Sequence, residues 1–232
     1  MHILLTRPLE DSKELILRFS SLGHKVSHLP VINIEPIEYD EPDYNQFKGV
    51  IFTSSNAIKN LDLTKLDKKI ECYCVGSATE KVAKLNGFQN IISAEGNVNN
   101  LKELILQNFD SKNGSLLYVS GKVVSSRLDK DLISEGYSLK RLINYTVSST
   151  LEIKEEFRTE LKKSIPDIIY VYSENSAKSL LNLLKKYDLL DNWMDTNLMC
   201  MGEKSSSILN EIKWKKIFLF NPGEEEFLLY KI

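Results

Sequence analysis

No long apolar run is present in this sequence. Among its 232 residues, no stretch approaches the roughly 20 apolar residues that span a bilayer. The short apolar segment at the N-terminus is followed at once by charged residues, so it lacks the apolar core of a signal peptide. These absences argue against a membrane partner and predict a cytoplasmic protein.

Cysteine and histidine are scarce, at three residues each. The histidines show no ligand spacing and no paired aspartate, and one C-x-C adds too few ligands, so we predict no metal. An odd number of cysteines, two of them alternating on one predicted strand, is typical of reduced, buried thiols and not of a disulfide framework. These cysteines are Cys72, Cys74 and Cys200.

An excess of charge of one sign is also missing. Lys and Arg number 30 and Asp and Glu number 32, which gives a formal net charge of −2. Because nucleic-acid binding requires a basic surface, no nucleic-acid partner is expected. The G-x-G-x-x-G turn, the G-x-x-x-x-G-K-[ST] P-loop and the G-x-S-x-G nucleophile elbow are absent as well. The residues alone therefore indicate neither a nucleotide cofactor nor a catalytic serine.

What the sequence does contain is a regular alternation of short apolar runs with segments of helical period. The runs include HILLT, GVIFT, IECYCV, GSLLYVS, DIIYVYS and NLMCM. Between the first two, Leu15, Phe19 and Leu22 recur at helical spacing before Gly23, which predicts a helix and its end. Strands alternating with helices indicate βαβ units, so we predict an α/β fold with mainly parallel sheets.

The alternation itself repeats along the chain. The segment beginning HILLT aligns without a gap on the one beginning SLLYV, with Leu4 opposite Leu117. IFTSSNA then aligns on YVYSENS, with Ser54 opposite Ser173, and CYCVGSAT aligns on LMCMGEKS, with Gly76 opposite Gly202. The three units occur twice in the same order, which predicts two similar domains. Whether the first unit folds with its neighbours or with the later pair stays open.

The turns that follow the strands are the candidate site. Free backbone N–H groups and the helix dipole attract anions there, each terminus contributing roughly 0.3–1 kcal/mol. A ligand that touches several termini gains affinity without a basic patch. The same residue types are the preferred helix N-caps, so each turn taken alone is more simply a cap. The candidates are Thr53, Ser54, Ser55, Gly76, Thr79, Ser173, Asn175, Gly202 and Ser205.

Taken in order, these segments resemble the uroporphyrinogen-III synthase family. The resemblance rests on LLTRP, LPVINI, IFTSSNA, CVGSATEKVAKLNGF, LLYVSGK, EGYSLKRLINYTV, VYSENSA and MGEKSSSIL. No single segment is specific, whereas the ordered set is, and it runs along nearly the whole chain.

The resemblance implies two similar flavodoxin-like (HemD-like) parallel-sheet domains, joined by a two-stranded linker, with the active site in a cleft between them. It also implies that the first unit packs with the C-terminal units. We therefore expect residues 1–34 plus 152–232 to form one discontinuous domain and residues 40–143 the other. Residues 35–39 and 144–151 are expected to be the linker strands.

The implied activity is a cyclisation in tetrapyrrole (haem) biosynthesis. An enzyme of this family closes linear hydroxymethylbilane to uroporphyrinogen III, with loss of water, inversion of ring D and no cofactor. Tyr145 matches the family's linker tyrosine and is expected to assist the loss of water. The turn residues are expected to bind the substrate's carboxylates, with Arg7 and Lys204 as further contacts. We also expect a monomer that receives its unstable substrate by transient handover from the preceding pathway enzyme.

Two departures from the family pattern put the binding residues in question. Glu203, Lys204 and Ser205 stand where the family usually has turn threonines, and Ser125 stands where it commonly has arginine. An alternative function for the same architecture is a non-catalytic, two-domain hinge protein that binds a small anionic ligand.

Overall fold

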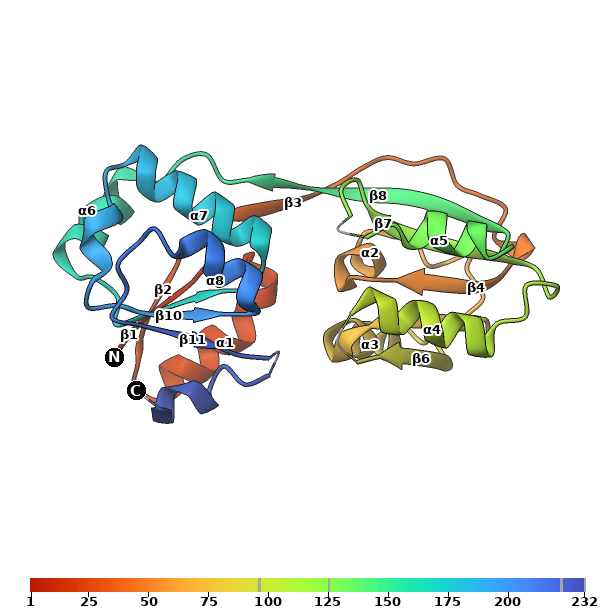
Figure 1. Ribbon diagram of the computed structural model, residues 1–232, viewed down its shortest axis with the longest axis horizontal. Helices are drawn as coiled ribbons and strands as arrows, with labels where there is room; N and C mark the ends of the chain where they lie inside the picture. Colours follow the sequence, from red (N-terminus) through yellow and green to blue (C-terminus); the bar gives the residue numbers. More distant parts are fainter. Residues whose placement is uncertain (96, 125, 222, 232) are drawn as a thin grey trace. The chain divides into compact units, whose positions relative to one another are not determined.

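The computed structural model describes residues 1–95, 97–124, 126–221 and 223–231. The chain forms two compact units, each with its own sheet (Figure 1). The first unit joins Met1–Asn33 to Ser148–Ile232, and the second is Ile34–Val147. Ser125, one of the two departures from the family pattern, lies outside the described residues.

The described part of the first unit contains a five-stranded parallel sheet in the order β2-β1-β9-β10-β11. Its strands are β1 (His2–Leu5), β2 (Lys25–His28), β9 (Ile168–Val171), β10 (Asn197–Cys200) and β11 (Lys216–Leu219). Because β1 pairs with β9, the N-terminal strand belongs to the sheet of the C-terminal half. The order of the strands reverses between β1 and β9, so this pair is the topological switch point at which doubly wound sheets bind ligands.

Helices cover both faces of this sheet, which explains why its strands are continuous apolar runs. Leu4 and Ile169 pack on the side of α7 (Glu174–Lys186), α8 (Glu203–Leu209) and α6 (Glu155–Lys163). Ile3 and Leu5 pack on the other side against Phe19 of α1 (Leu9–Ser21). Helix α6 follows the expected linker strand, residues 144–151, and was not predicted from the sequence.

The second unit contains a six-stranded sheet in the order β3-β8-β7-β4-β5-β6 within the described residues. The strands are β3 (Ile32–Pro36), β4 (Phe47–Phe52), β5 (Glu71–Val75), β6 (Asn90–Ala94), β7 (Ser115–Gly121) and β8 (Leu139–Ser149). The pairs from β8 to β6 are parallel. The strands β8-β7-β4-β5-β6 of this sheet correspond in position to β2-β1-β9-β10-β11 of the first sheet. The two sheets therefore share one strand order, with β7 in the place of β1. The predicted α/β class with parallel sheets is confirmed.

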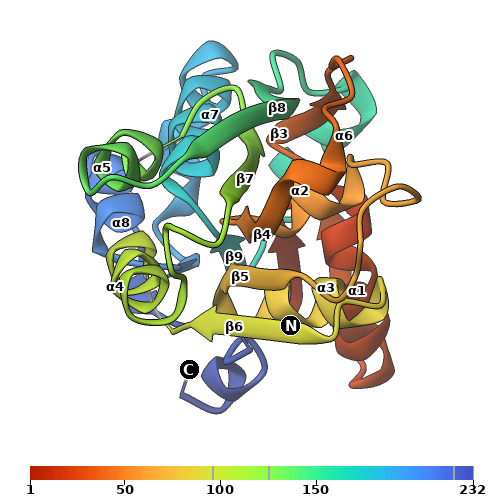
Figure 2. The same ribbon diagram turned by 90° about the vertical axis from the view of Figure 1, so that its right-hand side faces the viewer.

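Two helix layers enclose the second sheet, as Figure 2 shows. Helices α4 (Val98–Asn108) and α5 (Leu128–Ser134) pack on one face with Ile51, Tyr73 and Tyr118. Helices α2 (Ser55–Lys59) and α3 (Gly76–Leu85) pack on the other face with Val50 and Phe52. Both layers leave the carboxyl ends of β7, β4 and β5 at one edge of the sheet, where the turns of interest lie.

The buried histidine of β1 predicts a pH dependence of stability. His2 is 6% exposed, and its Nε2 lies 2.8 Å from Ser27 Oγ. Burial, followed by the Lys25 cation, lowers the pKa of His2 below its ordinary value, against the opposing effect of Glu160 and Asp167. As the pH falls through the ordinary value of about 6.5, the unfolded chain binds the proton before the folded one does. The free energy of unfolding should therefore fall from pH 7 toward the lowered pKa.

Urea unfolding of His2→Asn between pH 7 and pH 5 checks this expectation. The variant should lose less stability over that interval than the wild type, because the group that titrates differently in the two states has been removed. His24→Asn serves as the matched control for the loss of an imidazole in the same unit. Equal pH slopes for His2→Asn and the wild type would contradict the prediction.

Candidate functional site

The predicted turn residues lie at the carboxyl edges of the two sheets. In the second unit, Thr53–Ser55 follow β4, and Gly76 and Thr79 follow β5. In the first unit, Arg7 follows β1, Ser173 and Asn175 follow β9, and Gly202, Lys204 and Ser205 follow β10. Since β4 and β5 are neighbours, as are β1, β9 and β10, each unit brings its own set of turns together at one edge.

Two of the predicted serines act as helix caps. Ser54 precedes α2 and accepts a hydrogen bond from the N–H of Asn56 at 3.3 Å. Ser173 precedes α7 and accepts one from the N–H of Ser176 at 3.1 Å. Such caps satisfy one donor of a helix N-terminus, which has four. Capping and anion binding are therefore compatible at these turns.

The turns after β5 and β10 each contain a glycine whose backbone conformation favours this residue type. Gly76 has φ of 77° and Gly202 has φ of 88°. In this left-handed region a Cβ atom is strained, so the shared glycine follows from the shape of the turn. Lys204 Nζ lies 3.7 Å from Glu174 Oε1 and not against Glu203, so it links the beginnings of α8 and α7.

The hydroxyl residues that follow these glycines are deeply placed. Thr79 is 4% exposed and Ser205 is 2% exposed. Ser205 Oγ donates to the carbonyl of Met201 at 3.2 Å. Their contact with a carboxylate stays a prediction.

Tyr145 lies on β8 beside the end of β7. Its carbonyl accepts a hydrogen bond from the N–H of Lys122 at 2.9 Å, and a register irregularity between Ser120 and Gly121 pairs Gly121 with Tyr145. The ring rests on Gly121: a Cβ atom added there would lie 2.8 Å from Tyr145 Cζ and 3.1 Å from its hydroxyl oxygen. Among the residues that the structure describes, this hydroxyl has no hydrogen-bond partner. The phenol is thus fixed in place while its O–H is uncommitted.

Arg141 holds the same strand end in place and was not predicted from the sequence. Its Nε donates to Ser120 Oγ at 2.8 Å, and one terminal nitrogen donates to the carbonyls of Gly121 at 2.9 Å and Lys122 at 3.2 Å. The other terminal nitrogen lies 3.6 Å from a carboxylate oxygen of Asp129. With these contacts Arg141 fixes the backbone on which the Tyr145 ring rests.

Tyr118 is a second phenol at this strand end. Its hydroxyl oxygen lies 3.2 Å from Thr53 Oγ1, one of the predicted binding residues. Burial raises the pKa of Tyr118, while the hydrogen bond with Thr53 and the charge of Arg141 act in the opposite direction. No short sequence motif could have shown this contact, because 65 positions separate the two residues.

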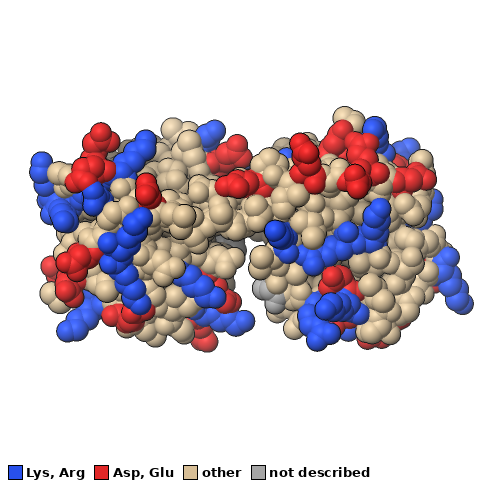
Figure 3. Space-filling view, turned by 90° about the horizontal axis from the view of Figure 1, so that it is seen from above, with Lys and Arg blue, Asp and Glu red and all other residues tan. Residues whose placement is uncertain are grey.

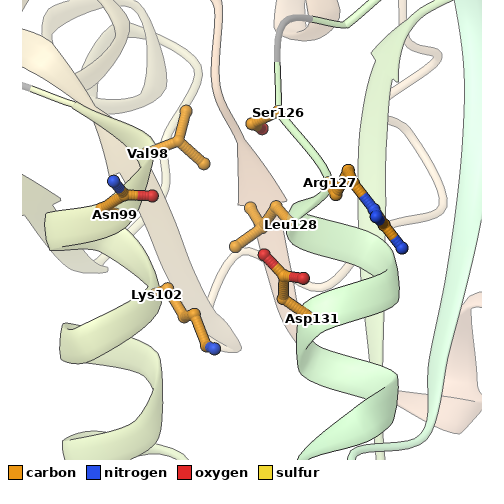
Figure 4. A pocket seen from close by; sticks show the side chains of 7 residues that line it. All are labelled: Val98, Asn99, Lys102, Ser126, Arg127, Leu128 and Asp131. Carbon is orange, nitrogen blue, oxygen red and sulfur yellow. The ribbon is translucent and has the colours of Figure 1, made fainter.

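A small cavity lies near this edge between the first turns of α4 and α5. It has a volume of about 300 Å³, and Figure 4 shows the side chains that line it. None of the residues predicted from the sequence belongs to it. The lining residues are Val98, Asn99, Lys102, Ser126, Arg127, Leu128 and Asp131.

Three further observations bear on ligand class. Within the described ranges, no group of three or more His, Cys, Asp or Glu side chains is arranged to hold a metal ion. No described helix is both long and apolar enough to cross a membrane. On the face drawn in Figure 3, Lys and Arg are interspersed with Asp and Glu over each unit. An anionic ligand on that face would meet no large basic area.

These features define a class: an α/β protein of two flavodoxin-like units whose polar strand-to-helix turns gather at the carboxyl edges of the sheets. A family model described as Uroporphyrinogen-III synthase HemD matches residues 13–219. The chain belongs to the uroporphyrinogen-III synthase HemD family. The match confirms the predicted family and its activity, the cyclisation of hydroxymethylbilane to uroporphyrinogen III.

Solved structures agree with the fold. The uroporphyrinogen-III synthetase of Helicobacter pylori is 19% identical and superposes with a TM-score of 0.65, over 99% of this chain and 97% of that one. A mutant uroporphyrinogen III synthase of Thermus thermophilus is 13% identical and gives 0.59, over 100% and 98% of the two chains. Comparison with curated proteins gave no match. At these identities the structures support the fold and leave the residue roles to the geometry of this chain.

Proposed function

We propose that this chain performs its cyclisation by holding the carboxylates of hydroxymethylbilane at the turns of both units and by donating a proton from Tyr145. The observation that carries the proposal is the Tyr145 phenol, which is fixed against Gly121 yet has no hydrogen-bond partner among the described residues. A phenol O–H is a hydrogen-bond donor, so an uncommitted one can donate to the hydroxyl that leaves the substrate.

The chemistry requires little else from the protein. The pyrrole nitrogen of ring A expels the terminal hydroxyl, the C–O bond breaks, and the hydroxyl leaves as water with the proton of Tyr145. The resulting azafulvene is attacked by the substituted α-carbon of ring D, which forms a spiro intermediate. The bond from that carbon to its original methylene then breaks and forms again at the free α-carbon. Loss of that carbon's proton restores the aromatic pyrrole, and Tyr145 regains a proton, so the net change is the loss of one water. No cofactor is needed.

Orientation is the main contribution expected of the protein. Free hydroxymethylbilane closes at its unsubstituted α-carbon and gives isomer I, so the enzyme has to favour the more hindered carbon. Holding reactants in one geometry lowers such a barrier without added reactive groups. The substrate carries eight carboxylates, and the chain has a formal net charge of −2. The substrate is therefore bound by local donors at Thr53–Ser55, Gly76, Ser173, Asn175 and Gly202, with Arg7 and Lys204, and not by the overall field.

The instability of the substrate also bears on the setting of the reaction. Because free hydroxymethylbilane closes spontaneously to the wrong isomer, direct handover from the enzyme that makes it protects the yield of isomer III. We propose that the chain acts as a cytoplasmic monomer that contacts its supplier only transiently.

Isomer analysis tests the function directly. The purified protein is mixed with freshly generated hydroxymethylbilane, the products are oxidised, and the uroporphyrin isomers are separated by chromatography. Isomer III is expected to dominate. Isomer I alone, formed at the rate of a protein-free control, would overturn the proposal and favour a non-catalytic anion-binding protein.

A further inference from the structure

The end of β1 places an arginine against a buried tyrosine at the switch point of the first sheet. Leu5 of β1 pairs with Tyr170 of β9, so Arg7 and Tyr172 come two positions later, just past the ends of these neighbouring parallel strands. The guanidinium carbon of Arg7 lies 4.3 Å from the centroid of the Tyr172 ring. This is a cation–π contact at the edge where ligands of doubly wound sheets bind.

Both the backbone and the side chain of Arg7 are held in place by contacts. Its carbonyl accepts hydrogen bonds from His28 Nε2 at 2.7 Å and from Ser12 Oγ at 3.3 Å. Its side chain, half-buried, lies on the ring with the guanidinium donors uncommitted to any acceptor among the described residues. An arginine ordered in advance loses less freedom when it binds, and its planar fork suits a carboxylate.

Tyr172 is a rigid support for this contact. It is 4% exposed, and its ring packs against Tyr170 at 6.3 Å and edge-on against Phe220 at 5.5 Å between centroids. Burial, followed by the charge of Glu225, raises the pKa of Tyr172, so its hydroxyl stays neutral. That hydroxyl is buried and has no hydrogen-bond partner among the described residues. Tyr172 therefore contacts Arg7 through its ring.

We propose that Arg7, stacked on Tyr172, forms a carboxylate-binding site at the switch point of the first unit, and that Tyr172 is its positioning residue. The inference rests on the proposed function, since the ligand is one carboxylate of the substrate. It adds a residue to which the sequence analysis gave no role, because Tyr172 stands where the first copy of the turn has Thr53. Arg7 binds and orients substrate and takes no part in proton transfer.

Steady-state kinetics of isomer III formation test the site with four variants. Arg7→Gln should raise KM about tenfold, the effect of losing one charge-assisted bond, with kcat within about twofold. The KM of Arg7→Lys should lie between those of the wild type and Arg7→Gln, because lysine keeps the charge and lacks the planar fork. Tyr172→Phe keeps the ring and should raise KM less than Tyr172→Leu, which should raise it about two- to fivefold.

A second arginine of the same unit provides the matched control. Arg158 lies over the ring of Tyr187, with 4.6 Å between its guanidinium carbon and the ring centroid. This pair involves α6 and the residue after α7, away from the carboxyl edge. Arg158→Gln should lower the melting temperature and leave KM unchanged.

The outcomes separate this inference from the function on which it rests. An unchanged KM in Arg7→Gln, or a fall in kcat alone, would overturn the carboxylate site while isomer III from the wild type upholds the function. Equal damage from Tyr172→Phe and Tyr172→Leu would overturn the positioning role, because the ring would then not be the part that matters. If the wild type itself formed no isomer III, both proposals would fall together. Arg7→Gln changes only a half-buried side chain, so this variant should fold. It tests the carboxylate site even if Tyr172→Leu fails to fold.

Discussion

Tyr145→Phe is expected to lower the kcat of isomer III formation by about a hundredfold, the low end of what a positioned general acid contributes. The change removes only the hydroxyl, so the ring still rests on Gly121 and the strand pairing at Lys122 is kept. KM should change little, because the carboxylate contacts belong to other residues. The measurement is the initial rate of isomer III formation at saturating substrate.

The matched control for this change is Tyr137→Phe in the same unit. The Tyr137 hydroxyl donates to the carbonyl of Phe109 at 3.2 Å, so its loss removes one structural hydrogen bond and no reactive group. That variant should lose about 0.5–1.5 kcal/mol of stability and keep its kcat. An unaltered kcat in Tyr145→Phe would show that Tyr145 is not the acid, and the family assignment would stand.

The residues that carry these predictions differ in how far the sequence reveals them. The strands were readable because burial on both faces makes them continuous apolar runs, as in HILLT and DIIYVYS. The turn serines were readable because a cap and an anion site use the same residue types, and Ser54 and Ser173 are indeed caps. Each of these signals is local in the chain.

Contacts across strands were out of reach of the sequence. Arg141 donates to Ser120 and Tyr118 meets Thr53 because parallel pairing and register bring them together. The repeat could not decide whether the first strand joins the later units, since both pairings satisfy the same apolar pattern. Register also decides which polar residues are buried. Glu225, for example, is 7% exposed, and its carboxylate accepts a hydrogen bond from the N–H of Gly223.

Gly121 should be as sensitive as Tyr145 itself, although it has no reactive group. In Gly121→Ala the new Cβ would lie 2.8 Å from Tyr145 Cζ and 2.9 Å from Cε2, closer than real Cβ contacts, and 3.1 Å from the hydroxyl oxygen. Pairing with β8 fixes the backbone of Gly121, and Arg141 holds its carbonyl, so the ring is the part that has to move. Overpacking of this kind costs about 1–3 kcal/mol of stability. A displacement of the reactive group by about 1 Å costs about a hundredfold in rate.

A double-mutant cycle separates the steric cause from a general loss of fold. Tyr145→Ala removes the ring, so adding Gly121→Ala to that background should cost little further stability and little further rate. The two changes are then strongly non-additive, as expected for residues in direct contact. Urea unfolding and the isomer III assay on the four proteins of the cycle measure both terms. If Gly121→Ala were equally damaging with and without the ring, the close approach of Tyr145 would not be the reason for glycine at this position. The glycine would then be required by the backbone at the end of β7 and not by the ring of Tyr145. The expected non-additivity instead shows that Gly121 is needed at the end of β7 because the ring of Tyr145 lies against it.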